Sequence, residues 1–284
     1  MKHTGEFDGR AERENVLGVS FRLFLDTILD RLRRLEANSL VTNFTLLIAF
    51  RMSAADVFVR MVVTFFLNIL AYFINDFIDV EIDLSSATKN RAKALYIREH
   101  RRTAFALIGS TSAGLLLFTL FYSTSVCFGV LLALLTTVLY THYFKRMAFL
   151  DILGCFVWGI AMAWPAIPDF SREGFRLVVL IGLFAASFEV VQCVKDCEED
   201  RRCNLRTTPI AVGIPASFLI VRSLYVLSAV YTVFVLREMQ GLILLLPVFF
   251  KTDKRMETYW LQIRLVFGFV WVTIMVRLFY GCYP

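Results

Sequence analysis

The chain has 284 residues and a net charge of +6, and 58% of its residues are hydrophobic, with 28 Phe and a mean hydropathy of +0.64. A soluble domain is about half apolar, and a chain of this length is too short to bury such an excess in one core. The basic residues fall in clusters between apolar segments, a pattern that excludes a nucleic-acid-binding stripe and therefore nucleic acid as a partner.

The first 36 residues are polar and lack the apolar core of a signal peptide. We expect residues 1–36 to form a cytoplasmic tail and residues 37–284 to form a single domain. Runs of about 20 apolar residues match the thickness of a bilayer. The sequence therefore predicts an all-α, multi-pass membrane protein in contact with lipid, a bundle of nine transmembrane helices. The predicted segments are 38–52, 55–78, 103–122, 124–141, 150–168, 175–195, 210–236, 239–250 and 260–281.

The Lys and Arg residues predict the orientation. With a cytoplasmic N-terminus, 23 of the 30 basic residues lie in the cytoplasmic regions and only four in the outer connections. Basic residues gather on the cytoplasmic side of membrane proteins, so this orientation is favoured. The eighth segment is the shortest, but omitting it would move Lys251, Lys254 and Arg255 to the outside. Nine spans therefore fit the charge pattern best.

Two acidic clusters follow the second and sixth segments, on the predicted cytoplasmic side. The first acidic cluster, residues 75–83, places Asn75, Asp79 and Asp83 four residues apart, with Asp76 beside them. The second acidic cluster, residues 196–200, begins with Asp196 and ends with Asp200. Residues four apart lie on one face of a helix.

Carboxylates arranged in this way repel one another, and the negative end of the helix dipole makes the position worse. Folding alone gives no reason for the arrangement, whereas a divalent cation would compensate the charge. Ligand sets built from oxygen atoms suit Mg²⁺, which fills its remaining coordination positions with water and phosphate oxygens. A solvated helix end is the simpler interpretation of either cluster taken alone.

Basic residues follow each cluster and favour a phosphate ligand. Lys89, Arg91 and Lys93 follow the first cluster, and Arg201, Arg202 and Arg206 follow the second. Lys145 and Arg146 lie between the two clusters along the chain. Carboxylates that hold a metal, together with Lys and Arg that bind phosphate oxygens, are the components of a diphosphate site.

These motifs resemble those of the UbiA superfamily of intramembrane prenyltransferases. The first family motif, N-D-x-x-D-x-x-x-D, is complete in residues 75–83, and the second, D-x-x-x-D, is Asp196 to Asp200 followed by Thr207-Thr208-Pro209. The stretch Tyr140 to Arg146 resembles the family's Tyr/Lys loop. Arg34 and Asn38 resemble its R-x-x-N entry. The resemblance covers nearly the whole chain.

The resemblance implies the chemistry and the site. Mg²⁺ would be held by Asn75, Asp79, Asp196 and Asp200, with Asp76 and Asp83 assisting. The diphosphate of an isoprenyl diphosphate would be bound by Lys145, Arg91, Tyr140, Arg34 and Asn38. Departure of the diphosphate would leave an allylic carbocation in an apolar cavity, where an unidentified lipophilic or aromatic acceptor attacks it. Glu189, in the sixth segment, would either pair with Arg222 or accept a proton.

Two departures from the family pattern keep alternatives open. Arg91 is followed by Ala92 where the family has Pro, and Asn204 stands where the family has Gly, a change that a left-handed turn tolerates. A terpene cyclase on the same fold would share the metal site, and phosphoribosyl transfer to a polyprenyl phosphate is a third enzyme option on this fold. A cation-coupled transporter is the alternative outside enzymes, but transporter sites lie near the bilayer midplane at broken helices.

Overall fold

The computed structural model describes residues 15–33, 38–86, 89–252 and 256–281, and every regular element in these ranges is helical. Six of the helices are long and apolar enough to cross a membrane by length and composition. They are α3 (Ala54–Ile78), α6 (Arg101–Tyr122), α7 (Thr124–His142), α9 (Arg172–Lys195), α12 (Ile214–Val230), which continues as the π-helical turn η3 (Tyr231–Val235), and α13 (Met256–Phe279).

The other three predicted segments are also helical but shorter. They are α2 (Asn38–Ala49), α8 (Leu150–Ala163), followed by the 3₁₀ turn η2 (Trp164–Ala166), and the 3₁₀ helix η4 (Met239–Phe249). A crossing normally needs about 20 helical residues, so nine spans and the cytoplasmic N-terminus remain predictions. Because a 3₁₀ helix rises about 2.0 Å per residue, η4 extends further than an α-helix of the same length.

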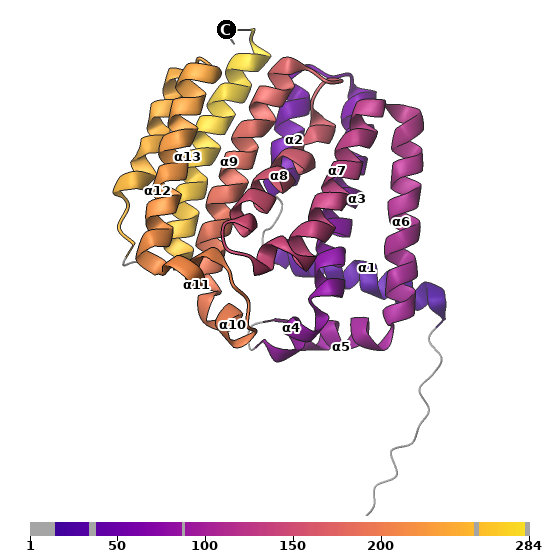
Figure 1. Cartoon of the computed structure of the whole chain (residues 1–284). Helices are drawn as coiled ribbons and strands as arrows, with labels where there is room; N and C mark the ends of the chain where they lie inside the picture. Colours follow the sequence, from indigo (N-terminus) through magenta and orange to yellow (C-terminus); the bar gives the residue numbers. More distant parts are fainter. Residues whose placement is uncertain (1–14, 34–37, 87–88, 253–255, 282–284) are drawn as a thin grey trace, which may run out of the picture.

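A further group of short helices, distinct from α2, α8 and η4, lies at the end of the bundle opposite the C-terminus (Figure 1). We call this the basal end. Four of these helices carry or adjoin the two acidic clusters: α4 (Val80–Ser85), α5 (Arg91–Glu99), α10 (Cys197–Arg202) and α11 (Thr208–Val212). The single 3₁₀ turn η1 (Phe144–Arg146) follows α7. Both acidic clusters therefore lie at the same end of the molecule, as the sequence predicts.

Helix α1 (Val16–Arg33) lies across the bundle at this end (Figure 1). Val19 and Leu23 are 3% and 2% exposed and pack in a cluster with Phe73 of α3 and Ile97 of α5. The tail expected over residues 1–36 therefore includes a helix that belongs to the folded body.

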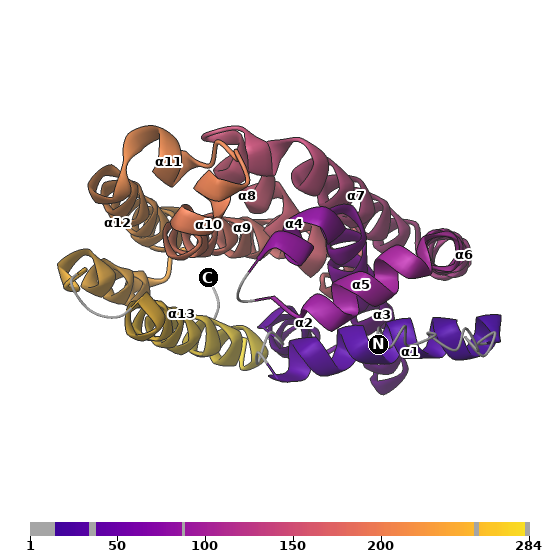
Figure 2. The ribbon, with the colours of Figure 1, turned by 90° about the horizontal axis from the view of Figure 1, so that it is seen from below.

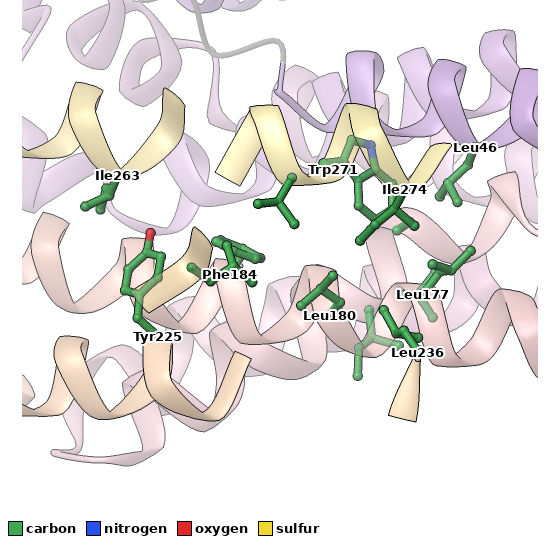
Figure 3. Packing of buried hydrophobic residues seen from close by; sticks show 14 of the residues in the cluster. Leu46, Leu177, Leu180, Phe184, Tyr225, Leu236, Ile263, Trp271 and Ile274 are labelled. Carbon is green, nitrogen blue, oxygen red and sulfur yellow. The ribbon is translucent and has the colours of Figure 1, made fainter. Parts of the chain in front are cut away.

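The largest apolar core joins α9 to α2, α8, α12 and α13 (Figure 3). Phe184 of α9 packs edge-on against Tyr225 of α12 and lies 3.4 Å, centroid to centroid, from Phe267 of α13. Helices α8 and α9 are in close contact at Gly182, where an added Cβ would lie 2.8 Å from the carbonyl oxygen of Phe156. Small residues allow such close contact between helices in a membrane.

Arg60 of α3 is buried near the opposite end of the bundle. Its guanidinium donates to the carbonyl oxygens of Pro165 and Ile167 at 3.0 and 2.7 Å and pairs with Asp169 at 3.2 Å. Because a cation in an apolar bundle requires such partners, Arg60 fixes the turn between α8 and α9.

Candidate active site

A cavity of about 390 Å³ opens among the basal halves of the helices. Its polar lining comes from both acidic clusters and from Arg31, Lys89 and Lys145. Its deeper wall is apolar and aromatic and includes Trp158, Phe184, Phe188, Trp260 and Phe267. One end therefore offers charge and the other a surface for hydrocarbon.

The first acidic cluster lies where α3 ends and α4 begins. Asp79 occupies the junction, with φ −86° and ψ 10°. Its N–H donates to the carbonyl of Asn75, and its own carbonyl accepts from the N–H of Asp83, both at 2.9 Å. Asn75 and Asp83 both line the cavity, and the Asn75 side chain accepts from the Thr141 hydroxyl at 3.3 Å.

Asp79 is 2% exposed, and the Lys145 ammonium lies 2.7 Å from its Oδ2. Its Oδ1 is buried without a hydrogen-bond partner in the part of the chain that the structure describes. A buried acceptor without a partner is costly, and a further cation beside this oxygen would remove the cost, although Asp79 itself does not line the cavity.

Asp76 faces another direction. Its two carboxylate oxygens pair with Arg31 at 2.9 Å and with Lys93 at 2.6 Å, in a small polar pocket beside the main cavity. Both cations are largely buried. The metal role that the sequence assigns to Asp76 therefore does not fit its position, because the carboxylate already compensates two buried cations outside the main cavity.

The second acidic cluster repeats the geometry of the first. Asp196 occupies the junction of α9 and α10 with φ −91° and ψ 3°, and the Gln192 amide donates to its Oδ2 at 2.7 Å. Asp196, Glu199 and Asp200 line the cavity, while Glu198 is exposed. The Ser86 hydroxyl donates to Glu199, which links the loops that carry the two clusters.

The turn after the second cluster has the conformation that the family motif requires. Asn204 has φ 54°, which confirms the predicted left-handed turn at this position. The carboxylate of Asp151, at the start of α8, accepts from the backbone N–H and the hydroxyl of Thr208 at 2.7 and 2.6 Å. The Thr207-Thr208-Pro209 stretch is therefore held to α8, and α10 with it.

The electrostatics of the site indicate a shortage of positive charge. Burial raises the pKa of Asp83, and Asp76 and Asp79 add to the shift while Lys89 and Lys145 oppose it. Burial likewise raises the pKa of Asp200, to about 6, against the opposing effect of Lys145. A cation bound between the clusters would remove this penalty.

The donor set fits a hard divalent cation by its chemistry. It consists of amide and carboxylate oxygens, and Asp79 retains an unpaired one. Among the described residues, however, no three His, Cys, Asp or Glu side chains converge closely enough to hold a metal by themselves. Phosphate oxygens and water would therefore have to complete the coordination, as is usual for Mg²⁺.

The predicted diphosphate ligands separate into two groups. Lys145, Tyr140 and Asn38 line the cavity, and Arg264 donates to the Asn38 side chain. Arg91 is exposed at the start of α5 and lies outside the cavity lining, so its predicted contact is not present in this arrangement. Arg34 lies outside the described residues.

Two basic residues that were not predicted as diphosphate ligands line the cavity, whereas Arg91 does not. Lys89 lines the cavity with its ammonium 3.9 Å from Asp83, and Arg31 lines it with its guanidinium 4.0 Å above the ring of Tyr72. Lys89 was recognisable only as one member of a basic segment. Arg31 was hidden in the expected tail, and no sequence signal connects it to Asp76.

Glu189 lines the cavity inward of the second cluster. Its carboxylate accepts from the Tyr140 hydroxyl and from the thiols of Cys193 at 3.2 Å and Cys155 at 3.6 Å. The alternative of an ion pair with Arg222 is wrong, because the structure gives Glu189 these three neutral donors instead. Glu189 precedes Asp196 by seven positions, which places it about 10 Å further along the axis of α9.

A helical membrane bundle whose cavity joins two acidic clusters to an apolar interior defines the class of this protein. The sequence pattern of the UbiA prenyltransferase family matches residues 40–252, most of the chain. The chain therefore belongs to the UbiA prenyltransferase family and is an integral, multi-pass membrane protein.

Solved structures share the fold at low sequence identity. A UbiA homologue from Archaeoglobus fulgidus bound to GPP and Mg²⁺ has a TM-score of 0.67 and 13% identity, covering 92% of this chain and 99% of that one. A structure of digeranylgeranylglyceryl phosphate synthase has a TM-score of 0.69 and 15% identity, also covering 92% of this chain and 99% of that one. A UbiA homologue from Aeropyrum pernix K1 has a TM-score of 0.57 and 17% identity, over 85% and 96%. No curated protein sequence matches the chain significantly.

Proposed function

We propose that this protein transfers a prenyl group from an isoprenyl diphosphate to an acceptor inside the membrane, with Mg²⁺ as cofactor. The observation that carries the proposal is the single cavity in which Asn75, Asp83, Asp196 and Asp200 meet Lys89 and Lys145 at one end and aromatic side chains at the other. Family membership supports prenyl transfer as the reaction class. The homologue bound to GPP and Mg²⁺ supports the substrate class and the cofactor.

The basal end of the cavity binds the diphosphate in this proposal. Asn75, Asp79 and Asp83 from one cluster, with Asp196 and Asp200 from the other, would hold Mg²⁺, while Lys145, Lys89 and Arg31 contact phosphate oxygens. Bound Mg²⁺ would supply the charge that stabilises the departing diphosphate. Lys145 adds positive charge at the same place, and its bond to Asp79 orients it before substrate arrives.

The apolar end receives the prenyl chain. Aromatic side chains of α9 and α13 exclude water and stabilise the allylic cation through their ring quadrupoles. The bond between C1 and the diphosphate oxygen breaks first and the diphosphate keeps the electron pair; the acceptor then forms its bond to the cationic C1. We assign the proton that the acceptor then loses to Glu189, the acid that lies deepest along α9 in this cavity.

The test is Mg²⁺-dependent diphosphate release by the purified protein, supplied with geranyl, farnesyl or geranylgeranyl diphosphate. We expect Asp79→Ala and Asp196→Ala to abolish release. Glu198→Ala is the matched control, because Glu198 belongs to the same cluster but is exposed and outside the cavity. Absence of both binding and release for every diphosphate would refute the proposal.

The products, extracted and identified by mass spectrometry, separate transfer from cyclisation. Release that depends on an added acceptor, with a prenylated product, supports a transferase. A cyclic hydrocarbon or alcohol formed without an acceptor would instead assign a terpene cyclase to the same site.

A further inference from the structure

Helix α1 carries an apolar face that the protein does not cover. Leu17, Phe21, Leu25 and Leu29 recur every four residues and are 76%, 69%, 37% and 40% exposed. We call these four residues the α1 stripe. Val19, Leu23 and Thr27 lie two residues further along, on the opposite side of the helix, and they are buried against the bundle.

The position of α1 places this stripe at the edge of the molecule. The helix lies crosswise to the long helices near the basal end (Figure 1), and the view from below shows it along one side of the bundle (Figure 2). It packs against α3 and α6, two of the helices able to cross a membrane.

The apolar surface of α1 is continuous with that of a membrane-spanning helix. Phe24 of α1 lies beside the α1 stripe, and the centroid of its ring is 6.0 Å from that of Phe66 on α3. Phe66 is itself 37% exposed and follows Phe58 and Val62, which are 70% and 38% exposed at the same four-residue spacing. Exposed apolar residues on a spanning helix face lipid hydrocarbon. Lipid is therefore the occupant that covers both surfaces without a break.

We propose that α1 is an interfacial helix whose stripe is inserted in the lipid boundary at the basal side of the membrane. Arg22, which is exposed, and Asp26, which is half-buried, lie 3.9 Å apart on the flank of the helix and face the aqueous phase. An amphipathic helix in this position buries its apolar face about 5–10 Å into the headgroup and acyl boundary. This assignment is independent of the proposed reaction.

The last turn of α1 also reaches the cavity. Arg31 pairs with Asp76 at 2.9 Å and lines the cavity mouth. The membrane surface and one wall of the diphosphate end are therefore joined by a single rigid helix.

The test measures the depth of α1 in the full chain, reconstituted in vesicles of phosphatidylcholine and phosphatidylglycerol. A nitroxide on p-acetylphenylalanine, introduced in turn at Leu17, Phe21 and Leu25, leaves the native cysteines unchanged. Arg22 and Asp26 are the matched controls, since they lie next to Phe21 and Leu25 on the polar flank of the same helix. Collision rates with oxygen, which enters lipid, and with a water-soluble nickel chelate report the environment of each label.

We expect the three stripe positions to favour oxygen over the nickel chelate and the two controls to show the reverse. Stripe labels as accessible to the chelate as the controls would overturn the proposal, because α1 would then lie in water. Stripe labels shielded from both reagents would also overturn it, since protein would cover the stripe. Dipolar broadening that disappears on dilution with unlabelled protein would identify a second copy as that cover.

Discussion

The ammonium nitrogen of Lys145 lies 2.7 Å from Oδ2 of Asp79, which joins the loop after α7 to the junction of α3 and α4. The carboxylate is almost fully buried, and its second oxygen is unpaired among the described residues. A buried carboxylate that already holds one cation and retains a free acceptor is prepared for a second cation.

Removing the cation of this pair is expected to destabilise the protein. Lys145→Met leaves Asp79 buried and uncompensated, a change that costs about 3–5 kcal/mol in comparable buried pairs. Thermal unfolding in detergent would show a lower Tm. The double variant with Asp79→Asn should recover part of the loss, because the unpaired charge is gone. Strictly additive losses would contradict the coupling.

Asp76 and Asp83 are expected to differ although they belong to one motif. Asp76→Asn removes the carboxylate that Arg31 and Lys93 share, while Lys93 keeps Asp30 at 3.7 Å, so we expect a loss of stability of up to about 3–5 kcal/mol. Asp83→Asn instead removes a cavity oxygen and should weaken binding of Mg²⁺ with diphosphate at nearly unchanged Tm. Calorimetry of binding and thermal unfolding, run on both variants, would expose a reversed pattern.

The pH dependence follows from the raised pKa of Asp200, about 6 in the folded protein against about 3.8 for an ordinary Asp. Between these values the folded state binds more protons than the unfolded state. Metal-free stability should therefore fall as the pH rises from about 4 through about 6. Asp200→Asn should remove the part of this dependence that Asp200 contributes and leave the part that the raised pKa of Asp83 contributes.

Metal binding should show the opposite trend at Asp200. Because Mg²⁺ binds the ionised carboxylate, its affinity should decrease as the pH falls below about 6. Titration of the protein with Mg²⁺ and a non-reactive diphosphate at several pH values would measure this. The same pH profile in the wild type and in Asp200→Asn would contradict the assignment.

Lys89, just before α5, and Arg91, the first residue of α5, form a matched pair of basic residues. Lys89 lines the cavity, whereas Arg91 is exposed outside it. Lys89→Ala is expected to raise the KM for the prenyl diphosphate about tenfold, the effect of losing roughly 1.4 kcal/mol of charge-assisted binding. Arg91→Ala should stay within about twofold. Equal effects would show that α5 rearranges when substrate binds.

Glu189→Gln tests the proposed proton acceptor. Gln retains an oxygen that accepts from Tyr140 but cannot take a proton at neutral pH. We expect product formation to fall about 10²–10⁴-fold, as for loss of a general base, with binding of the prenyl diphosphate unchanged. A parallel loss of binding would instead assign Glu189 to positioning Tyr140.

The sequence by itself determined the class of the protein and the place of its site. Apolar runs long enough for a bilayer fix helical structure, since buried backbone groups in lipid must be paired within a helix. Acidic residues repeated every four positions mark one helix end, and two such ends on the side rich in Lys and Arg predict a shared site. The left-handed turn at Asn204 was also predictable, because few residues tolerate that conformation.

The tertiary structure decided which partner each residue of a motif meets. Asp76 and Asp79 are three residues apart, yet one pairs with Arg31 from α1 and the other with Lys145 from the loop after α7. Such partners come from distant parts of the chain, and no local spacing records them. For the same reason, the sequence did not show that Lys89 lines the cavity in place of Arg91, or that α1 belongs to the folded body. Side-chain direction at a helix end depends on what packs against it, and only the folded chain brings those neighbours together.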